Sequence, residues 1–128
     1  MTRKEVVAGP GVPVGIGPYS QAVRAGDFVF VSGQPGVDPA TGSVVGPTFA
    51  EQAHQVFRNL EAVLAEADSR LDLVVSTTVL VADQGDFAEL NALFAEFFPV
   101  EPPARMTMQV SLPRGLLLSI GCTALTAR

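Results

Sequence analysis

The segment from Arg105 to Ala124 alternates apolar and polar residues with a period of two. A period of two places successive side chains on opposite faces of a β-strand. The segment therefore predicts two strands, joined by the turn Leu112-Pro113-Arg114-Gly115, each with one face in the core and one polar face. The apolar positions that we expect in the core are Met106, Met108, Val110, Leu112, Leu116, Leu118, Ile120, Cys122 and Ala124.

Two other segments repeat with a period of three and four, which is typical of amphipathic helices. The first begins at Thr48, where Glu51 three residues later completes a capping-box signature. The second begins near Asp86, where Glu89 completes a similar signature, and it ends before Pro99. The apolar stripe of the first helix consists of Ala53, Val56, Leu60, Val63 and Ala67, and that of the second of Phe87, Leu90, Phe94 and Phe97.

The remaining apolar runs predict three further strands. Residues 21–24 and 28–32 flank the turn Ala25-Gly26-Asp27 and read as a hairpin. Residues 72–81 are dense in valine, threonine and leucine, which favours a central strand. The predicted order is ββαβαββ after a candidate N-terminal strand, an α+β arrangement with two helices on one face of a sheet.

The composition limits the number of domains and the class of partner. A chain of 128 residues fits a single domain, which we expect to span residues 1–128. Charged residues make up only 16% of the chain, which leaves few charges to cover its surface and suggests an oligomer. The net charge of -5 has the wrong sign for binding nucleic acid through its phosphates.

Cysteine usage and hydropathy indicate the cellular compartment. Cys122 is the only cysteine, so no internal disulfide can form, and its apolar surroundings predict a buried, unreactive thiol. No run of 18 apolar residues and no leader-like segment is present. We expect a cytoplasmic protein without a membrane segment.

The usual signatures of metal and phosphate sites are missing from the sequence. His54 is the only histidine and lies on the polar side of the first predicted helix, where we expect it to be solvated. A transition-metal site needs several histidine or cysteine ligands, so no metal is expected. Gly15-Ile16-Gly17 is followed by Pro18, which cannot supply the N–H donors of a phosphate-binding loop.

Several polar residues occur at unusual places, and Arg105 is the most informative of them. It begins a strand directly after Pro102-Pro103-Ala104. An arginine at a strand start can be a simple rim charge, but its planar fork of donors also matches a carboxylate. Tyr19, Ser32-Gly33-Gln34 and Asn91 are further polar candidates. The residues thus allow a site for a small acid, with Arg105 as its anchor.

Four motifs in order resemble the Rid (YjgF-type) family of reactive intermediate, or imine, deaminases. They are Gly17-Pro18-Tyr19-Ser20-Gln21, Val31-Ser32-Gly33-Gln34, Asn91 within Leu90-Asn91-Ala92-Leu93-Phe94, and Pro103-Ala104-Arg105. The resemblance extends from about Ile16 to Ala127. It implies a chorismate-mutase-like fold with a mixed sheet, assembled as a barrel-like homotrimer with ligand sites in the clefts between subunits.

The resemblance also implies roles for individual residues. Arg105 would bind the carboxylate of a 2-imino acid or enamine, assisted by backbone groups around Gly33 and Thr107. Tyr19, Ser32 and Asn91 would line the same cleft. The implied reaction hydrolyses the imine to a 2-oxo acid and ammonia without a metal or an organic cofactor.

The sequence departs from the family pattern at Gly121, where active members usually carry a glutamate that helps to activate water. General acid/base assistance typically contributes about 10² to 10⁴ in rate. Three interpretations remain open: a slow deaminase, a trimer that binds carboxylates without catalysis or with changed specificity, and a glycine that only marks a strand bend. A smaller departure is Thr107, where cysteine is common. An RNA-cleaving role, a label given to some relatives, is disfavoured by the acidic pI.

Overall fold

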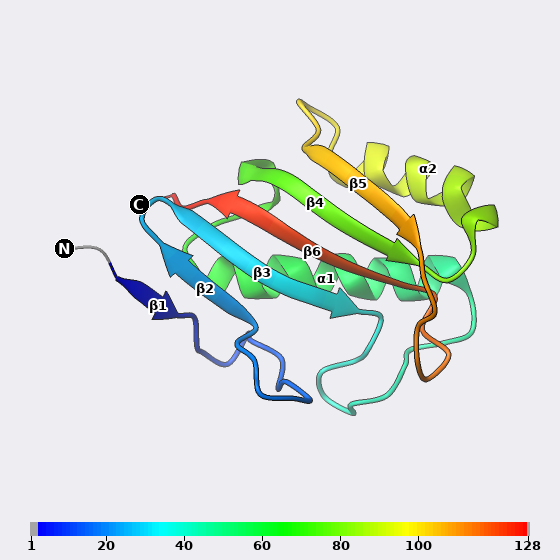
Figure 1. Cartoon of the computed structure of the whole chain (residues 1–128), viewed down its shortest axis with the longest axis horizontal. Helices are drawn as coiled ribbons and strands as arrows, with labels where there is room; N and C mark the ends of the chain where they lie inside the picture. Colours follow the sequence, from blue (N-terminus) through cyan, green and yellow to red (C-terminus); the bar gives the residue numbers. More distant parts are fainter. Residues whose placement is uncertain (1–2, 128) are drawn as a thin grey trace.

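The computed structural model describes residues 3–127, and it confirms the α+β class and the predicted element order (Figure 1). The candidate N-terminal strand is present as β1. The elements are β1 (Lys4–Val6), β2 (Ala22–Ala25), β3 (Phe28–Pro35), α1 (Phe49–Glu66), the 3-10 turn η1 (Leu71–Leu73), β4 (Val74–Val81), the 3-10 turn η2 (Gln84–Asp86), α2 (Phe87–Phe97), β5 (Ala104–Gln109) and β6 (Leu118–Leu125).

The strands form one mixed sheet in the order β1-β2-β3-β6-β4-β5. Only β4 and β5 pair in parallel, and α2 connects them. Figure 1 shows α1 and α2 on the same side of this sheet, which leaves the other side without helices. We call these two sides the helix face and the open face. Within residues 3–127, no helix is long and apolar enough to cross a membrane.

The core lies between the two helices and the helix face of the sheet. Phe57 of α1 is fully buried, and its ring stacks on that of Phe97 with centroids 4.1 Å apart. The β6 residues predicted to face the core are indeed buried, and burial raises the pKa of the Cys122 thiol to about 12. The fully buried apolar side chains include Val29, Val56, Phe57, Leu60, Leu64, Val79, Leu90, Leu118 and Ile120.

The first predicted capping box is confirmed and the second is wrong. The Thr48 hydroxyl accepts a hydrogen bond from the Glu51 N–H at 3.2 Å and donates to the Glu51 carboxylate at 2.7 Å. Asp86, in contrast, makes no side-chain capping bond, because η2 inserts an extra turn whose Gly85 N–H donates to Asp83. Partial burial, followed by repulsion from Asp83 and Glu89, raises the pKa of Asp86.

The prediction for the faces of β5 is also wrong. Thr77 is buried on the helix face and pairs with Arg105, so Arg105 and Thr107 lie on that face as well. Met106 and Met108 lie on the open face and are 59% and 42% exposed. The alternation shows which residues share a face, but α2 packs over the side that carries the polar ones.

His54 differs from its prediction in a similar way. It is only half-buried rather than solvated, its Nδ1 lies 2.8 Å from the Ala50 carbonyl oxygen, and its ring meets that of Phe97 edge-on. The apolar stripe of α1 alone puts His54 on the polar side, because the stripe does not reveal that α2 packs beside α1. His54 therefore belongs to the packing between the two helices.

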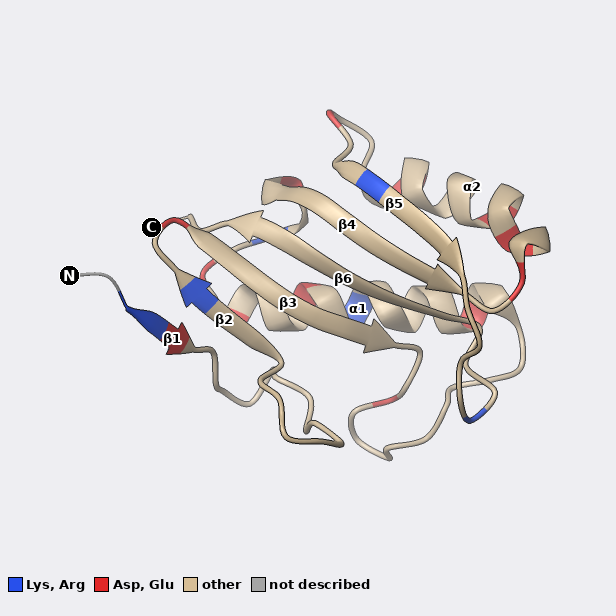
Figure 2. Ribbon diagram, in the orientation of Figure 1, with Lys and Arg blue, Asp and Glu red and all other residues tan. Residues whose placement is uncertain are grey.

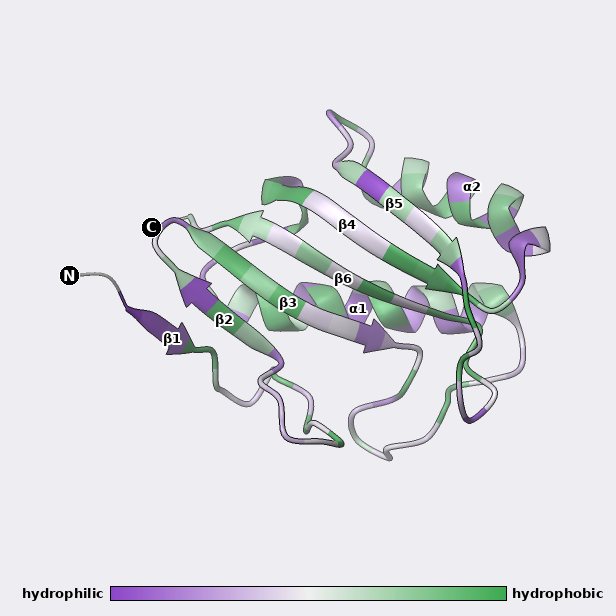
Figure 3. Ribbon diagram, in the orientation of Figure 1, coloured by the Kyte–Doolittle hydropathy of each residue, from purple (hydrophilic) through white to green (hydrophobic). Residues whose placement is uncertain are grey.

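The open face is uncharged along its centre and partly apolar. Figure 2 shows no charged residue on β3, β6 or β4, in agreement with their sequences. Figure 3 shows apolar segments on these strands, and Phe28 and Phe30 of β3 are exposed with ring centroids 6.4 Å apart. Met106 and Met108 are also exposed on this face, at its other edge on β5, and exposed apolar side chains of this kind are often covered by association.

Candidate ligand-binding site

Arg105 is held in place by two residues of α2. Its Nη2 donates a hydrogen bond to the Asn91 side-chain oxygen at 2.8 Å. Its guanidinium carbon lies 4.8 Å from the centroid of the Phe94 ring, a cation–π geometry. No carboxylate within residues 3–127 forms an ion pair with Arg105. The Arg105 guanidinium is therefore held in one orientation, and its other N–H groups remain as donors for an external acid.

The surface next to Arg105 is apolar. A hollow of about 430 Å³, here called the Arg105 hollow, is lined by Phe94, Ala95, Phe98, Pro99, Pro102, Pro103 and Arg105. The prolines fix the backbone that leads into β5. The arrangement offers one cationic group beside a rigid hydrophobic wall, which suits a small acid with an apolar substituent. Thr107 lies two residues along the same face of β5 and is half-buried.

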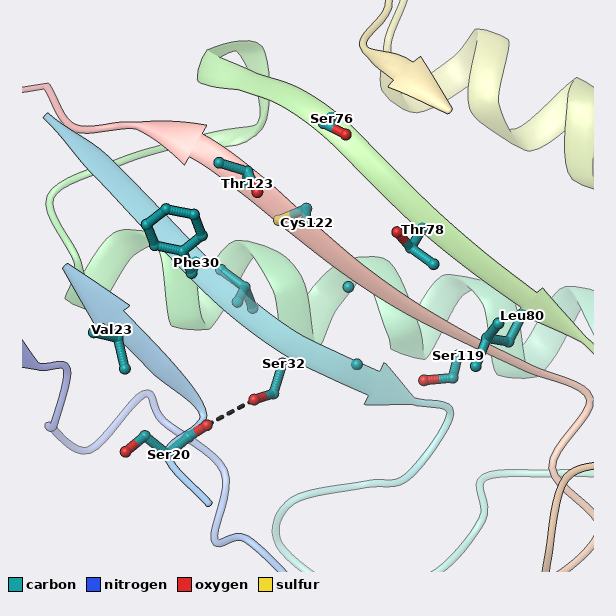
Figure 4. A pocket seen from close by; sticks show the side chains of 13 residues that line it. Ser20, Val23, Phe30, Ser32, Ser76, Thr78, Leu80, Ser119, Cys122 and Thr123 are labelled. Carbon is teal, nitrogen blue, oxygen red and sulfur yellow. Dashed lines mark hydrogen bonds between the residues drawn. The ribbon is translucent and has the colours of Figure 1, made fainter. Parts of the chain in front are cut away.

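Ser32 and Gly33 form a β-bulge in β3. The pairing of β3 with β6 is regular up to Val31 and resumes at Gln34, so that both residues stand opposite Gly121 alone. The Ser32 hydroxyl donates to the Ser20 carbonyl oxygen at 2.6 Å (Figure 4). The buried Gln34 amide donates to the Ser32 carbonyl oxygen and to the Gln21 side chain. These bonds fix the shape of the bulge.

Gly121 lies directly against this bulge. A Cβ added to Gly121 would be 3.2 Å from the Val31 carbonyl oxygen and 3.4 Å from the Gly33 nitrogen. The first carbon of any side chain here would therefore press on the backbone of β3. The bend that glycine was expected to mark lies in β3 opposite Gly121, whereas β6 itself continues through it.

A second hollow, here called the bulge hollow, opens on the open face beside Gly121 (Figure 4). Its volume is about 490 Å³. It carries six hydroxyl groups and no Lys, Arg, Asp or Glu. Its lining consists of Ser20, Val23, Phe30, Val31, Ser32, Gly33, Ser76, Thr78, Leu80, Ser119, Gly121, Cys122 and Thr123.

Tyr19 lies on the N-terminal loop and is 49% exposed. With Gly33 and Gln34 it lines a further cavity of about 270 Å³ beneath that loop. Its ring packs close to Gly17, where an added Cβ would lie 3.2 Å from the ring. Tyr19 is therefore a neighbour of the bulge and not of Arg105.

The predicted site residues fall into two separate groups within one copy of the chain. One group is Arg105, Asn91 and Thr107 on the helix face, and the other is Tyr19, Ser32 and Gly33 around the bulge. In the sheet, β6 and β4 separate β3 from β5, which corresponds to roughly 14 Å at the usual strand spacing. A single copy does not bring the two groups together.

Sequence reasoning missed two residues that shape these groups. Phe94 was assigned only to the apolar stripe of α2, although its ring also supports the Arg105 guanidinium. Gln34 was quoted within a motif without a role, although its buried amide holds the bulge. A glutamine two residues beyond the strand predicted over residues 28–32 was the available signal, because a buried amide has to find hydrogen-bond partners.

Comparisons with known proteins match almost the whole chain. The sequence profile of the endoribonuclease L-PSP family matches residues 11–126. A RutC family protein of Pyrococcus horikoshii is 42% identical over 122 residues, covering 94% of this chain and 97% of that protein. The mouse 2-iminobutanoate/2-iminopropanoate deaminase is 39% identical over 122 residues, covering 94% and 90%.

The structural comparison agrees with the sequence matches. The crystal structure of the YjgF gene product of E. coli superposes with a TM-score of 0.86 at 35% identity and covers 97% of this chain and 99% of that one. Profile, sequence identity and three-dimensional structure thus lead to one assignment. The chain belongs to the endoribonuclease L-PSP family, which is the YjgF/Rid family.

Proposed function

We propose that this protein binds small 2-oxo and 2-imino acids, with the Arg105 guanidinium holding their carboxylate. The observation that carries the proposal is the orientation of Arg105 by Asn91 and Phe94, with no carboxylate partner among residues 3–127. A preorganised guanidinium loses little side-chain entropy when it binds an acid. The relationship to a mouse protein named as an imine deaminase supports the same ligand class.

The proposed site is composite and lies between copies of the chain in a homotrimer. Arg105 of one copy would face the bulge residues Ser32 and Gly33 of the next, since one copy keeps them apart. The uncharged centre of the open face and its exposed side chains Phe30, Met106 and Met108 support such an association. Closed rings of identical subunits repeat the same contact and would therefore repeat the same site.

The reaction proposed for this site is the hydrolysis of a 2-imino acid. Water adds its oxygen to C2, the C=N π electrons move to nitrogen, and nitrogen gains a proton to give a carbinolamine. Nitrogen then leaves as ammonia when the hydroxyl proton transfers to it, and a 2-oxo acid remains. Because the bulge hollow contains no carboxylate, the residues can orient water but supply no strong base, so we expect slow turnover.

A binding protein without catalysis is the second candidate, and the same uncharged hollow favours it. One experiment separates the two. Alanine and an amino acid oxidase generate 2-iminopropanoate, which semicarbazide traps. A deaminase is expected to slow semicarbazone formation when it is added, whereas a pure binder is expected to bind pyruvate in calorimetry without changing the trapping. If the protein neither binds pyruvate nor slows trapping, the proposed function is wrong.

Mixing two defective variants tests the composite site. Arg105→Ala removes the carboxylate anchor, and Gly33→Val fills the bulge next to Ser119. Each variant alone is expected to lose pyruvate binding. After the two are unfolded and refolded together, about one site in four is expected to recover, because each half then comes from an intact copy half of the time. No recovery in mixed trimers that sedimentation has verified would place the whole site within one chain.

A further inference from the structure

Gly121 itself offers no side chain to a ligand, and the bulge in β3 leaves little room for one. The Val31 carbonyl oxygen and the Gly33 nitrogen lie 3.2 and 3.4 Å from the point where a Cβ would be. A Cβ at this position would require the backbone of β3 to give way by a few tenths of an ångström. On this part of β6, a side-chain polar contact to a bound acid therefore has to come from a neighbour of Gly121.

Ser119 is that neighbour. It precedes Gly121 by two residues and lies on the same face of β6. Its Oγ would be only 2.7 Å from a Cβ added at Gly33, so it stands directly at the bulge. Figure 4 shows its hydroxyl pointing toward β3. Ser119 is half-buried, and its side chain has no hydrogen-bond partner within residues 3–127.

The other hydroxyl at the bulge is already engaged. The Ser32 Oγ donates its only proton to the Ser20 carbonyl oxygen at 2.6 Å. Ser119 therefore provides the hydroxyl at this position whose donor and acceptor are both free. The bulge hollow around it holds no charged side chain, so it suits a neutral polar group rather than a second ionic one.

We propose that the Ser119 hydroxyl hydrogen-bonds the polar atom on C2 of the bound acid, while Arg105 of a neighbouring copy holds the carboxylate. This rests on the proposed function. A serine hydroxyl can donate to a 2-oxo oxygen, and it can donate to or accept from a 2-imino nitrogen. Ser119 is then the residue that distinguishes acids substituted at C2 from plain fatty acids.

The inference predicts a loss of ligand discrimination. Calorimetry with pyruvate and with propionate, which lacks the C2 oxygen, is expected to show tighter binding of pyruvate by the wild-type protein. Ser119→Ala is expected to weaken pyruvate binding roughly three- to tenfold and to leave propionate binding unchanged, as the loss of one neutral hydrogen bond would. Ser119→Thr, which keeps a hydroxyl, is expected to retain most of the preference.

Ser43→Ala is the control, because Ser43 is an exposed serine of the loop after β3 that lines neither hollow. It is expected to change neither affinity, and thermal melts check that all variants are folded. The role of Ser119 would be overturned if Ser119→Ala weakened the binding of both acids equally, or of neither. It would also be overturned if the wild-type protein bound both acids equally well. Arg105→Ala tests the proposed function separately, since its failure to weaken either ligand would refute the anchor itself.

Discussion

Replacement of Arg105 by alanine is expected to weaken pyruvate binding by roughly 100-fold or more. The guanidinium is the cation oriented toward the Arg105 hollow, and a bidentate contact to a carboxylate consists of two charge-assisted hydrogen bonds. Each such bond contributes about 1.5 to 3 kcal/mol, and about 1.4 kcal/mol corresponds to a tenfold change in affinity. Isothermal calorimetry of both proteins measures the difference.

Two further variants show whether geometry or charge causes this effect. Arg105→Lys keeps the charge but loses the fork and the stacking on Phe94, so we expect only partial recovery of affinity. Arg58→Ala removes an exposed arginine of α1 and changes the net charge equally, and it is expected to leave binding unchanged. If Arg58→Ala weakened pyruvate binding as much as Arg105→Ala, the loss of affinity would come from the change in net charge and not from a specific contact of Arg105.

Replacement of Gln52 by leucine is expected to lower the free energy of unfolding by roughly 3 to 9 kcal/mol. Gln52 lies in α1 and is fully buried. Its amide donates to the carbonyl oxygens of Gly46 and Gly115, and its carbonyl oxygen accepts from the Leu117 N–H at 2.7 Å. Leucine would leave three backbone groups without partners, and each such group costs about 1 to 3 kcal/mol.

Urea denaturation followed by circular dichroism measures this loss. Gln55→Leu is the matched control, since Gln55 is half-buried one turn later and donates only to the Asn59 side chain. We expect the control to lose about 1 kcal/mol or less. If Gln52→Leu also lost only about 1 kcal/mol, water would have to hydrogen-bond the three backbone groups as well as the glutamine does. The contacts of Gln52 connect α1 to the turn before β6, so its loss is also expected to loosen the cavity beside Tyr19.

Local sequence patterns were sufficient to predict the main helices and strands and some of the residues at which they begin or end. The period of three and four and the Thr48 capping box predicted α1, because a helix repeats its contacts within a few residues. The alternation predicted β5 and β6, and it placed Leu118, Ile120 and Cys122 in the core. The motif resemblance predicted the family, which profile, identity and fold all confirm.

The contacts of the candidate site residues were predicted less completely than the list of these residues. Arg105 and Asn91 were both chosen as site residues, and their side chains are hydrogen-bonded. The support of Arg105 by Phe94 was not predicted, because an aromatic residue on a helical stripe reads equally well as core. The contacts of Gln34 and the role proposed for Ser119 depend on a bulge that no local pattern indicated, since a bulge is defined by the pairing of two distant strands.

The sequence by itself determined which residues share a face and which segments form the helices, and it singled out Arg105 as the candidate anchor for an acid. Only the tertiary structure decided that Arg105 and not Met106 faces α2, that Ser32 and Gly33 oppose Gly121, and that Arg105 and the bulge are separated within one copy. The physical reason is that periodicity is a property of one segment. Which face is covered, and which side chains meet, depends on the register and packing of segments far apart in the chain.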